Sequence, residues 1–265
     1  MRIVIISASS DIGLHLAKQW LDDGHEVIGT YRTKNDSIDN LLVSGMKAFY
    51  CLLEDNGSIE QCCNEITEIG QWDCLVLCPG TMVPIGKFEE VDFLSWSRSV
   101  NINFIAQMSI VKKLLPSKQL DRPSTVIFFA GGGTNSAPLN YSAYTVSKIA
   151  LIKMCELLDA ESTDCKFSII GPGWVKTKIH NETIDAGDFA GQALQSTLRQ
   201  YEDGTWTSFE NIQKCCEWIM HSKKEIVGGR NFSVVHDSWG EKSLENHLLE
   251  NSNYYKLRRA GNDIL

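Results

Sequence analysis

The chain has 265 residues, of which 43% are hydrophobic and 22% are charged, and these proportions are ordinary for a globular protein. This length predicts a single large α/β domain with a substantial core. A formal charge of −8 and the lack of a basic stripe argue against a nucleic-acid partner. No apolar run approaches the roughly 20 residues of a membrane span, and the apolar run 3–6 is too short for a signal peptide. We therefore expect a cytoplasmic protein without a membrane partner.

The nine cysteines fall mostly inside predicted helices and strands, as in the pairs Cys62-Cys63 and Cys215-Cys216. Reduced cysteine commonly behaves there as a small buried apolar residue. Cys74 and Cys78 have a suggestive spacing, but no histidine or second cysteine pair stands near them. We predict no metal site.

Apolar segments rich in β-branched residues alternate with segments of helical periodicity along most of the chain. The expected strands are 2–7, 25–31, 47–52, 74–78, 125–129, 166–170 and 230–235. The expected helices are 12–23, 38–44, 58–69, 93–115 and 143–161. Strict alternation predicts a doubly wound parallel sheet with helices on both faces and ligands at the carboxyl ends of its strands.

Two segments fall outside this alternation. Residues 178–210 are polar and irregular in pattern, and we expect them to close over a substrate pocket. Residues 238–265 form a charged tail, whose Arg258 and Arg259 we expect at a helix end or between subunits. No repeat or Pro/Gly-rich linker divides the chain, so residues 1–237 are expected to form one domain.

Tyr144 and Lys148 stand four residues apart on a predicted helix and therefore share one face. On such a face an ammonium group can lower the pKa of the phenol and hold a nucleotide ribose, while the phenol acts as acid or base. The pair alone is a weak signal, because long helices contain such pairs by chance. Its position in the strand–helix order strengthens it.

Five landmarks between residue 1 and about residue 237 resemble those of the short-chain dehydrogenase/reductase family, in the same order. The resemblance implies a Rossmann-type fold and an NAD(P)-dependent oxidoreductase. The landmarks are the glycine-rich turn at 6–13, the segment 77–80, the helix-borne Asn103, the pair Tyr144 and Lys148, and the loop 172–177.

The glycine-rich turn departs from the family pattern. Ser7 and Asp11 stand where glycine is usual, and only Gly13 remains. Asp11 could cap the following helix, whereas a positive φ at Ser7 would cost roughly 1 kcal/mol. Ser9, Ser10 and the helix N-terminus still offer donors to a pyrophosphate. A tight turn that binds no ligand is the alternative.

The serine that the family places some thirteen residues before its tyrosine is missing here. Such a serine would hydrogen-bond the substrate carbonyl as charge develops on it. Thr134 or Ser136 could supply a hydroxyl, and the backbone N–H groups of residues 131–133 could act as donors instead. The alternative is that carbonyl chemistry is weak or absent.

The end of the second strand favours NADP(H) over NAD(H). An acid there would bind the ribose 2′-hydroxyl, but this chain has Arg32, Thr33 and Lys34. Arg32 can make bidentate contacts to a 2′-phosphate, with Thr33 beside it. The family's acid after the third strand corresponds to Leu52, so Glu54, Asp55 or simple packing would have to meet the adenine.

The resemblance also implies functions for individual residues. Tyr144 would donate a proton to the carbonyl oxygen, Lys148 would hold the ribose and lower the pKa of Tyr144, and Asn103 would anchor a water that resupplies protons. Thr134 is added as the substitute for the missing serine. The predicted nucleotide-binding residues are Ser7, Ser9, Ser10, Asp11, Ile12, Gly13, Arg32, Thr33, Gly80, Tyr144, Lys148, Pro172, Gly173, Val175 and Thr177.

The polar segment 178–210 favours a small polar carbonyl or alcohol substrate, in particular a sugar-like one. Its candidate contacts are Lys178, His180, Asn181, Trp206 and Thr207. The glycine triplet and the tail also resemble family members of bacterial sugar and surface-glycan metabolism. The main alternative is a nucleotide-binding protein without turnover that acts as a sensor or partner subunit. A sugar-nucleotide dehydratase or epimerase is disfavoured, because those relatives are longer.

A homodimer or homotetramer is expected, because family members usually pair through the helices that carry the asparagine and the tyrosine. Apolar positions on these two helices fit either a subunit interface or packing on the sheet. They are Ile105, Met108, Val111, Leu115, Ile149, Ile152, Cys155 and Leu158.

Overall fold

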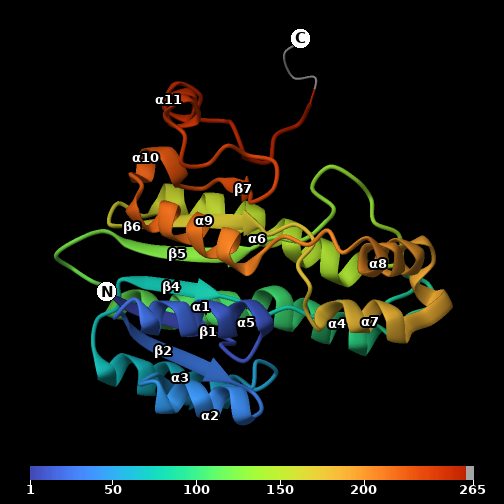
Figure 1. The fold of residues 1–265 in the computed structure, drawn as a ribbon, viewed down its shortest axis with the longest axis horizontal. Coiled ribbons are helices and arrows are strands. Elements are labelled where there is room, and N and C mark those ends of the chain that lie inside the picture. The colour runs from blue at the N-terminus through green and yellow to red at the C-terminus, as the bar shows by residue number, and fades with distance from the viewer. Residues whose placement is uncertain (261–265) are drawn as a thin grey trace.

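A seven-stranded parallel sheet forms the centre of the molecule, with helices on both faces, in the computed structural model, which describes residues 1–260 (Figure 1). The strand order is β3-β2-β1-β4-β5-β6-β7, and every neighbouring pair is parallel. The strands are β1 (Arg2–Ile6), β2 (Glu26–Tyr31), β3 (Lys47–Tyr50), β4 (Cys74–Leu77), β5 (Ser124–Phe129), β6 (Cys165–Gly171) and β7 (Asn231–Ser233). All seven expected strands are present, with ends that differ by one or two residues. The order reverses between β1 and β4, which is where such sheets form a ligand-binding crevice.

The helices within residues 1–260 cover the sheet and its carboxyl edge. They are α1 (Asp11–Asp22), α2 (Asp36–Val43), α3 (Asn56–Ile69), α4 (Phe93–Val100), α5 (Ala106–Leu114), α6 (Ser142–Glu161), α7 (Ile179–Ala186), α8 (Gln192–Asp203), α9 (Phe209–His221), α10 (Lys224–Val227) and α11 (Lys242–Glu250). Shorter turns are η1 (Asn101–Ile105), η2 (Leu115–Ser117) and η3 (Gly187–Ala190). None of the helices in this part of the chain has both the length and the apolar character needed to cross a bilayer.

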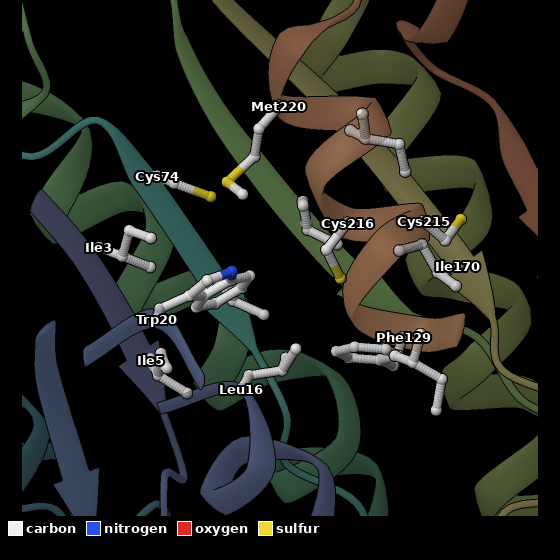
Figure 2. Close-up of a cluster of buried hydrophobic side chains, with 14 of the residues drawn as sticks. Ile3, Ile5, Leu16, Trp20, Cys74, Phe129, Ile170, Cys215, Cys216 and Met220 are labelled. Carbon is white, nitrogen blue, oxygen red and sulfur yellow. The ribbon is translucent and has the colours of Figure 1, made fainter. Parts of the chain in front are cut away.

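Alternate residues of each central strand enter two separate cores. Ile3 and Ile5 face the core that α1 and α9 cover, whereas Val4 and Ile6 face the core that α3, α5 and α6 cover. Figure 2 shows the first core, where Trp20 of α1 lies over β1 beside the side chains of α9. A sheet that is buried on both faces explains why its strands read as continuous apolar runs.

The helix expected over 93–115 is divided by a π-helical turn at η1. The turn widens the helix at Asn103, whose backbone carbonyl accepts a 2.8 Å bond from Gln107 Nε2. Such local widening often occurs at functional sites, because it redirects one side chain without ending the helix.

Most of the apolar positions proposed for a subunit interface pack within the chain. Val111, Ile152 and Cys155 are fully or almost fully buried in the core beneath α5 and α6. Ile105 is the exception, because half of its surface is exposed. Packing on the sheet therefore accounts for the three buried positions, whereas a subunit interface that uses the partly exposed ones stays a prediction.

The segment 178–210, whose sequence pattern is irregular, contains α7, η3 and α8. These helices gather with α4 at one end of the molecule, beyond the carboxyl ends of the strands (Figure 1). Polar residues dominate both helices, so the sequence lacks the apolar stripe that marks a helix lying on a core.

The C-terminal tail, through residue 260, packs on its own chain. Leu244 and Leu248 of α11 are buried, and the Arg230 guanidinium donates to the carbonyls of Leu248 and Tyr254 at 2.7 and 2.8 Å. Arg258 pairs with Glu156 of α6 at 2.6 Å. Arg258 does not lie at a helix end, because α11 ends at Glu250. Its expected position between subunits stays a prediction. Residues 261–265 of the expected tail lie outside the described residues.

Candidate active site

The carboxyl ends of the central strands open into a cavity of about 1340 Å³ that α6 and α7 also line. Of the predicted nucleotide-binding residues, all except Gly13 and Thr33 line this cavity. Thr134 lines it as well, whereas Asn103 is buried behind it. The fold thus brings the sequence landmarks together around one space.

The turn after β1 keeps the geometry of a glycine-rich turn with few glycines. Ser7 has a φ of 62°, which confirms that this position needs the left-handed region. Its N–H donates to Thr30 Oγ1 at 2.9 Å, and its carbonyl accepts from the Ser10 N–H at 3.0 Å. A Cβ at Gly13 would lie 2.5 Å from the Ser7 carbonyl oxygen. Gly13 is therefore required for the turn itself.

Asp11 does not cap α1, contrary to the expectation. Ser10 is the N-cap, and its Oγ accepts the Gly13 N–H at 3.1 Å. The Asp11 carboxylate accepts the Lys178 N–H at 2.6 Å, and the Lys178 ammonium lies 3.7 Å away. Asp11 therefore connects the start of α7 to the turn after β1.

The end of β2 presents one cation to the cavity. Arg32 lines the cavity and makes no ion pair within the described residues, whereas Lys34 pairs with Asp39 at 2.9 Å. Of the two acids considered for the adenine, Glu54 lines the cavity, where Arg98 Nε donates to it at 2.9 Å. Asp55 instead caps α3 by accepting the N–H of Gly57.

Tyr144 and Lys148 both face the cavity from α6. Lys148 is 3% exposed, and its Nζ donates to the carbonyls of Phe129 at 2.9 Å and Pro79 at 3.5 Å. Burial lowers the pKa of Lys148 to about 8. The pair therefore lies where the sequence placed it, with the ammonium held by main-chain carbonyls.

The expected lowering of the Tyr144 pKa by Lys148 is wrong in this structure. Burial raises the pKa of the Tyr144 phenol to about 12, and the negative charge of Glu182 adds to the rise. The Lys148 ammonium lies 5.6 Å from the centroid of the Tyr144 ring. Desolvation and the nearby acid therefore dominate the titration of this phenol.

Gly131 stands where the family has its serine, thirteen residues before Tyr144. A Cβ at Gly131 would lie 2.5 Å from Tyr144 Oη, so the phenol packs directly on the main chain. Thr134 is exposed and lines the cavity, whereas Ser136 is exposed and does not line it. Thr134 as the substitute hydroxyl stays a prediction.

Asn103 is fully buried, and its side chain holds the loop after β4. Its Oδ1 accepts the Thr81 N–H at 2.9 Å, and its Nδ2 donates to the Thr81 carbonyl at 2.8 Å. Both ends of the amide are thus bonded to one loop residue. The water-anchoring function expected of Asn103 stays a prediction.

Two residues of α7 join the site that the sequence reasoning did not single out. The Glu182 carboxylate accepts from the Met82 N–H at 2.5 Å and the Thr81 hydroxyl at 3.2 Å. Thr183 accepts a 2.9 Å bond from Tyr141 Oη, so the phenol of Tyr141 is engaged with α7. The polarity of this segment indicated a lid, but the face it turns inward depends on packing.

The candidate substrate contacts that the sequence suggested in segment 178–210 are divided. Some line the cavity, and others form a separate cluster. Lys178 and His180 line the cavity, whereas Asn181, Trp206 and Thr207 do not. The His180 ring stacks on the Trp174 ring, with 5.0 Å between the ring centroids, and its centroid lies 5.7 Å from that of Trp206. The indole of Trp206 therefore packs within segment 178–210 and does not face the cavity.

The C-terminal tail also forms part of the cavity wall. Tyr255, Lys256 and Leu257 line it, and the Tyr255 carbonyl accepts the N–H of Asn231 in β7 at 2.8 Å. The tail was considered for subunit contacts and not for the site, because its charges do not show on which surface it lies.

The fold and this site define a nucleotide-dependent oxidoreductase of the Rossmann type. The short chain dehydrogenase family pattern matches residues 1–187, and the chain belongs to this family of NAD(P)-dependent oxidoreductases.

Individual relatives have low identity and broad coverage. Dehydrogenase/reductase SDR family member 6 of Rattus norvegicus is 23% identical over 242 residues, which cover 89% of this chain and 96% of that protein. The benzil reductase ((S)-benzoin forming) IRC24 of Saccharomyces cerevisiae is 28% identical over 216 residues, covering 76% and 82%. The crystal structure of the short-chain dehydrogenase/reductase YIR035C of Saccharomyces cerevisiae superimposes with a TM-score of 0.79 at 20% identity, covering 92% and 98%.

Proposed function

We propose that this protein is an NADP(H)-dependent enzyme that reduces the carbonyl of a small polar, sugar-like substrate, or oxidises the corresponding alcohol. The observation that supports this most strongly is the pair of half-buried Tyr144 and buried Lys148, which faces the same cavity as the turn after β1. Proton donation and nucleotide binding would then occur within one enclosed space.

The residues around the turn after β1 fit a dinucleotide. Gly13 has no room for a side chain beside Ser7, so the backbone of the turn stays open at the N-terminus of α1. Ser9 and Ser10 line the cavity there and would hold the pyrophosphate together with the first N–H groups of the helix. Pro172, Gly173, Val175 and Thr177 also line the cavity and would hold the nicotinamide. When bound, the nucleotide supplies or accepts the hydride.

Arg32 is the reason to propose NADP(H) instead of NAD(H). Its guanidinium lines the cavity at the end of β2 without an ion pair in the described structure, so it is free to make bidentate bonds to a 2′-phosphate. Thr33, at the same end, would add a hydroxyl. Lys34 contributes less, because Asp39 already neutralises it.

Tyr144 would act as the proton donor in the reductive direction. Its pKa of about 12 keeps the phenol protonated at neutral pH, which is the state that an acid needs. Lys148 would bind the ribose hydroxyls from beneath the ring. Thr134, or the N–H groups of residues 131–133, would stabilise the developing negative charge on the substrate oxygen.

The first experiment is a pair of fluorescence titrations with NADPH and with NADH, followed by turnover assays. Benzil, named for the yeast relative, and a panel of keto-sugars would be the carbonyl substrates. Selective NADPH binding with oxidation of NADPH in the presence of one of these compounds supports the proposal. Binding of neither nucleotide contradicts it.

A second candidate function is nucleotide sensing without turnover, and the observation that favours it is Gly131 in place of the serine. Tight NADPH binding without turnover of any carbonyl compound would favour this candidate. The two titrations and the assays together therefore separate the two functions.

We also propose a homodimer or homotetramer through the surface of α4, η1 and α6. Five large apolar side chains are exposed there, and exposed apolar side chains on neighbouring helices are typical of interfaces. They are Phe93, Leu94, Ile105, Val146 and Leu157. Light scattering after gel filtration would give the mass, and Leu94→Asp should yield monomers if this surface is the interface.

A further inference from the structure

Helix α7 spans the cavity and is attached on both sides. On one side, Thr183 bonds to Tyr141, which lies immediately before α6. On the other side, Glu182 bonds to Thr81 and Met82 in the loop after β4. The helix begins with Ile179, whose Cδ1 lies 3.4 Å from where a Cβ at Gly80 would stand. These contacts place the inward face of α7 over the part of the cavity that Tyr144 and Lys148 line.

Glu182 brings an acid to this part of the cavity, and within the described residues it forms no ion pair. It lines the cavity together with Tyr144, and its bonds come from a backbone N–H and a neutral hydroxyl. Arg32 acts on Glu182 through its charge, which lowers the pKa of the carboxyl against the rise caused by burial, but the two side chains form no ion pair within the described residues. The other nearby cations are engaged elsewhere. Lys178 pairs with Asp11 and Arg98 with Glu54, while Lys148 is bonded to main-chain carbonyls.

The charge of Glu182 acts on the catalytic centre. It is the charged group whose field contributes to the raised pKa of Tyr144. A charge that perturbs the phenol must also act on a substrate group bound beside it, because Coulomb interactions in a partly buried cavity are only weakly screened.

We infer that Glu182 determines substrate specificity, so that the cavity accepts neutral or cationic carbonyl compounds and disfavours those with a carboxylate next to the carbonyl, such as 2-oxo acids. The inference rests on the proposed function, because it places the reacting carbonyl beside Tyr144. Like-charge repulsion at a binding site is a common source of discrimination between ligands of one shape.

The test compares two ligands of nearly equal shape, 2-oxo-2-phenylacetamide and 2-oxo-2-phenylacetate. Their dissociation constants from the complex with NADP⁺ would be measured by calorimetry for the wild type, Glu182→Gln and Asp185→Asn. The glutamine can keep both hydrogen bonds while it removes the charge. Asp185 lies on the same helix, is exposed and does not line the cavity, so its variant is a matched control.

We expect the wild type and Asp185→Asn to bind the amide about ten-fold more tightly than the acid, and Glu182→Gln to bind both within about two-fold. Glu182→Met, of similar length, provides a second neutral variant if the glutamine protein is unstable. An unchanged preference in the neutral variants, or no preference in the wild type, overturns the inference.

Turnover assays on the same proteins separate this inference from the proposed function. Charge-dependent binding without reduction of the amide would support the specificity of Glu182 and contradict the reductase function. Binding of neither ligand would overturn both.

Discussion

The turn after β1 and the loop after β5 lie at the same edge of the sheet, and each carries the residue expected of the other. Ser7 stands where glycine is usual, and Gly131 stands where serine is usual. At Ser7 the backbone adopts a φ of 62° although a Cβ is present. At Gly131 a Cβ would collide with the Tyr144 hydroxyl.

The two exchanges differ in what they change. Ser7 puts strain of roughly 1 kcal/mol into the backbone, but its N–H and carbonyl still make the bonds that close the turn. Gly131 relieves no backbone strain, because its φ is not in the left-handed region. It instead lets the Tyr144 phenol approach the main chain. One exchange therefore lowers stability, whereas the other changes the surroundings of Tyr144, the proposed proton donor.

The largest effect is expected from substitution of Tyr144, which packs on the loop after β5. Tyr144→Phe removes the proposed proton donor and should lower kcat roughly 100- to 10,000-fold. NADPH binding should remain, because the ring still fills its place beside Gly131. Stopped-flow assays and fluorescence titrations would measure the two quantities, and unchanged turnover would remove Tyr144 as the acid.

The fit between Gly131 and Tyr144 can be broken directly. Gly131→Ala should displace the phenol and lower kcat about 100-fold, as misplacement of a catalytic group by about 1 Å can do. Gly132→Ala is the matched control, because a Cβ there meets no atom within 4 Å. Equal activity of the two variants in steady-state assays would contradict the close contact.

The nucleotide end of the cavity should respond through affinity instead of turnover. Arg32→Ala should weaken NADPH binding roughly 10- to 100-fold, since bonds to a charged group are among the stronger ones. NADH binding should change little. Lys34→Ala should have a smaller effect on both nucleotides, because Asp39 already pairs with this lysine. Equal losses of NADPH and NADH affinity on Arg32→Ala would contradict the phosphate contact.

The smallest effect is expected at Ser7. Ser7→Gly should raise the free energy of unfolding by about 0.5 kcal/mol, because relief of the left-handed strain exceeds the added entropy of the unfolded chain. Ser9→Gly, in the same turn but without a positive φ, should instead destabilise the protein. Thermal melts monitored by circular dichroism would measure both variants. Destabilisation by Ser7→Gly would mean that the serine side chain stabilises the turn.

The sequence by itself determined the fold of this oxidoreductase and placed the proposed catalytic pair. Continuous β-branched runs alternating with helical periodicity predicted all seven strands, because a strand buried on both faces has to be apolar along its whole length. The spacing of Tyr144 and Lys148 was sufficient to place both on one face of α6, since this relation is internal to a helix. The absence of an acid at the end of β2 is also a feature of the local sequence, and it indicated Arg32 as a contact to a 2′-phosphate.

Only the tertiary structure decided how separate segments meet. Glu182 contacts Thr81, which lies about a hundred residues earlier in the chain. The inward face of α7 carries only two apolar residues, Ile179 and Ala186, so its sequence does not show that Glu182 faces the cavity. The position of Tyr144 against Gly131, and the wall formed by Tyr255–257, likewise depend on packing between distant segments. Periodicity records which side of a segment is buried, but it carries no information on which polar side chains of two segments will face each other. The specificity of the site depends on those contacts.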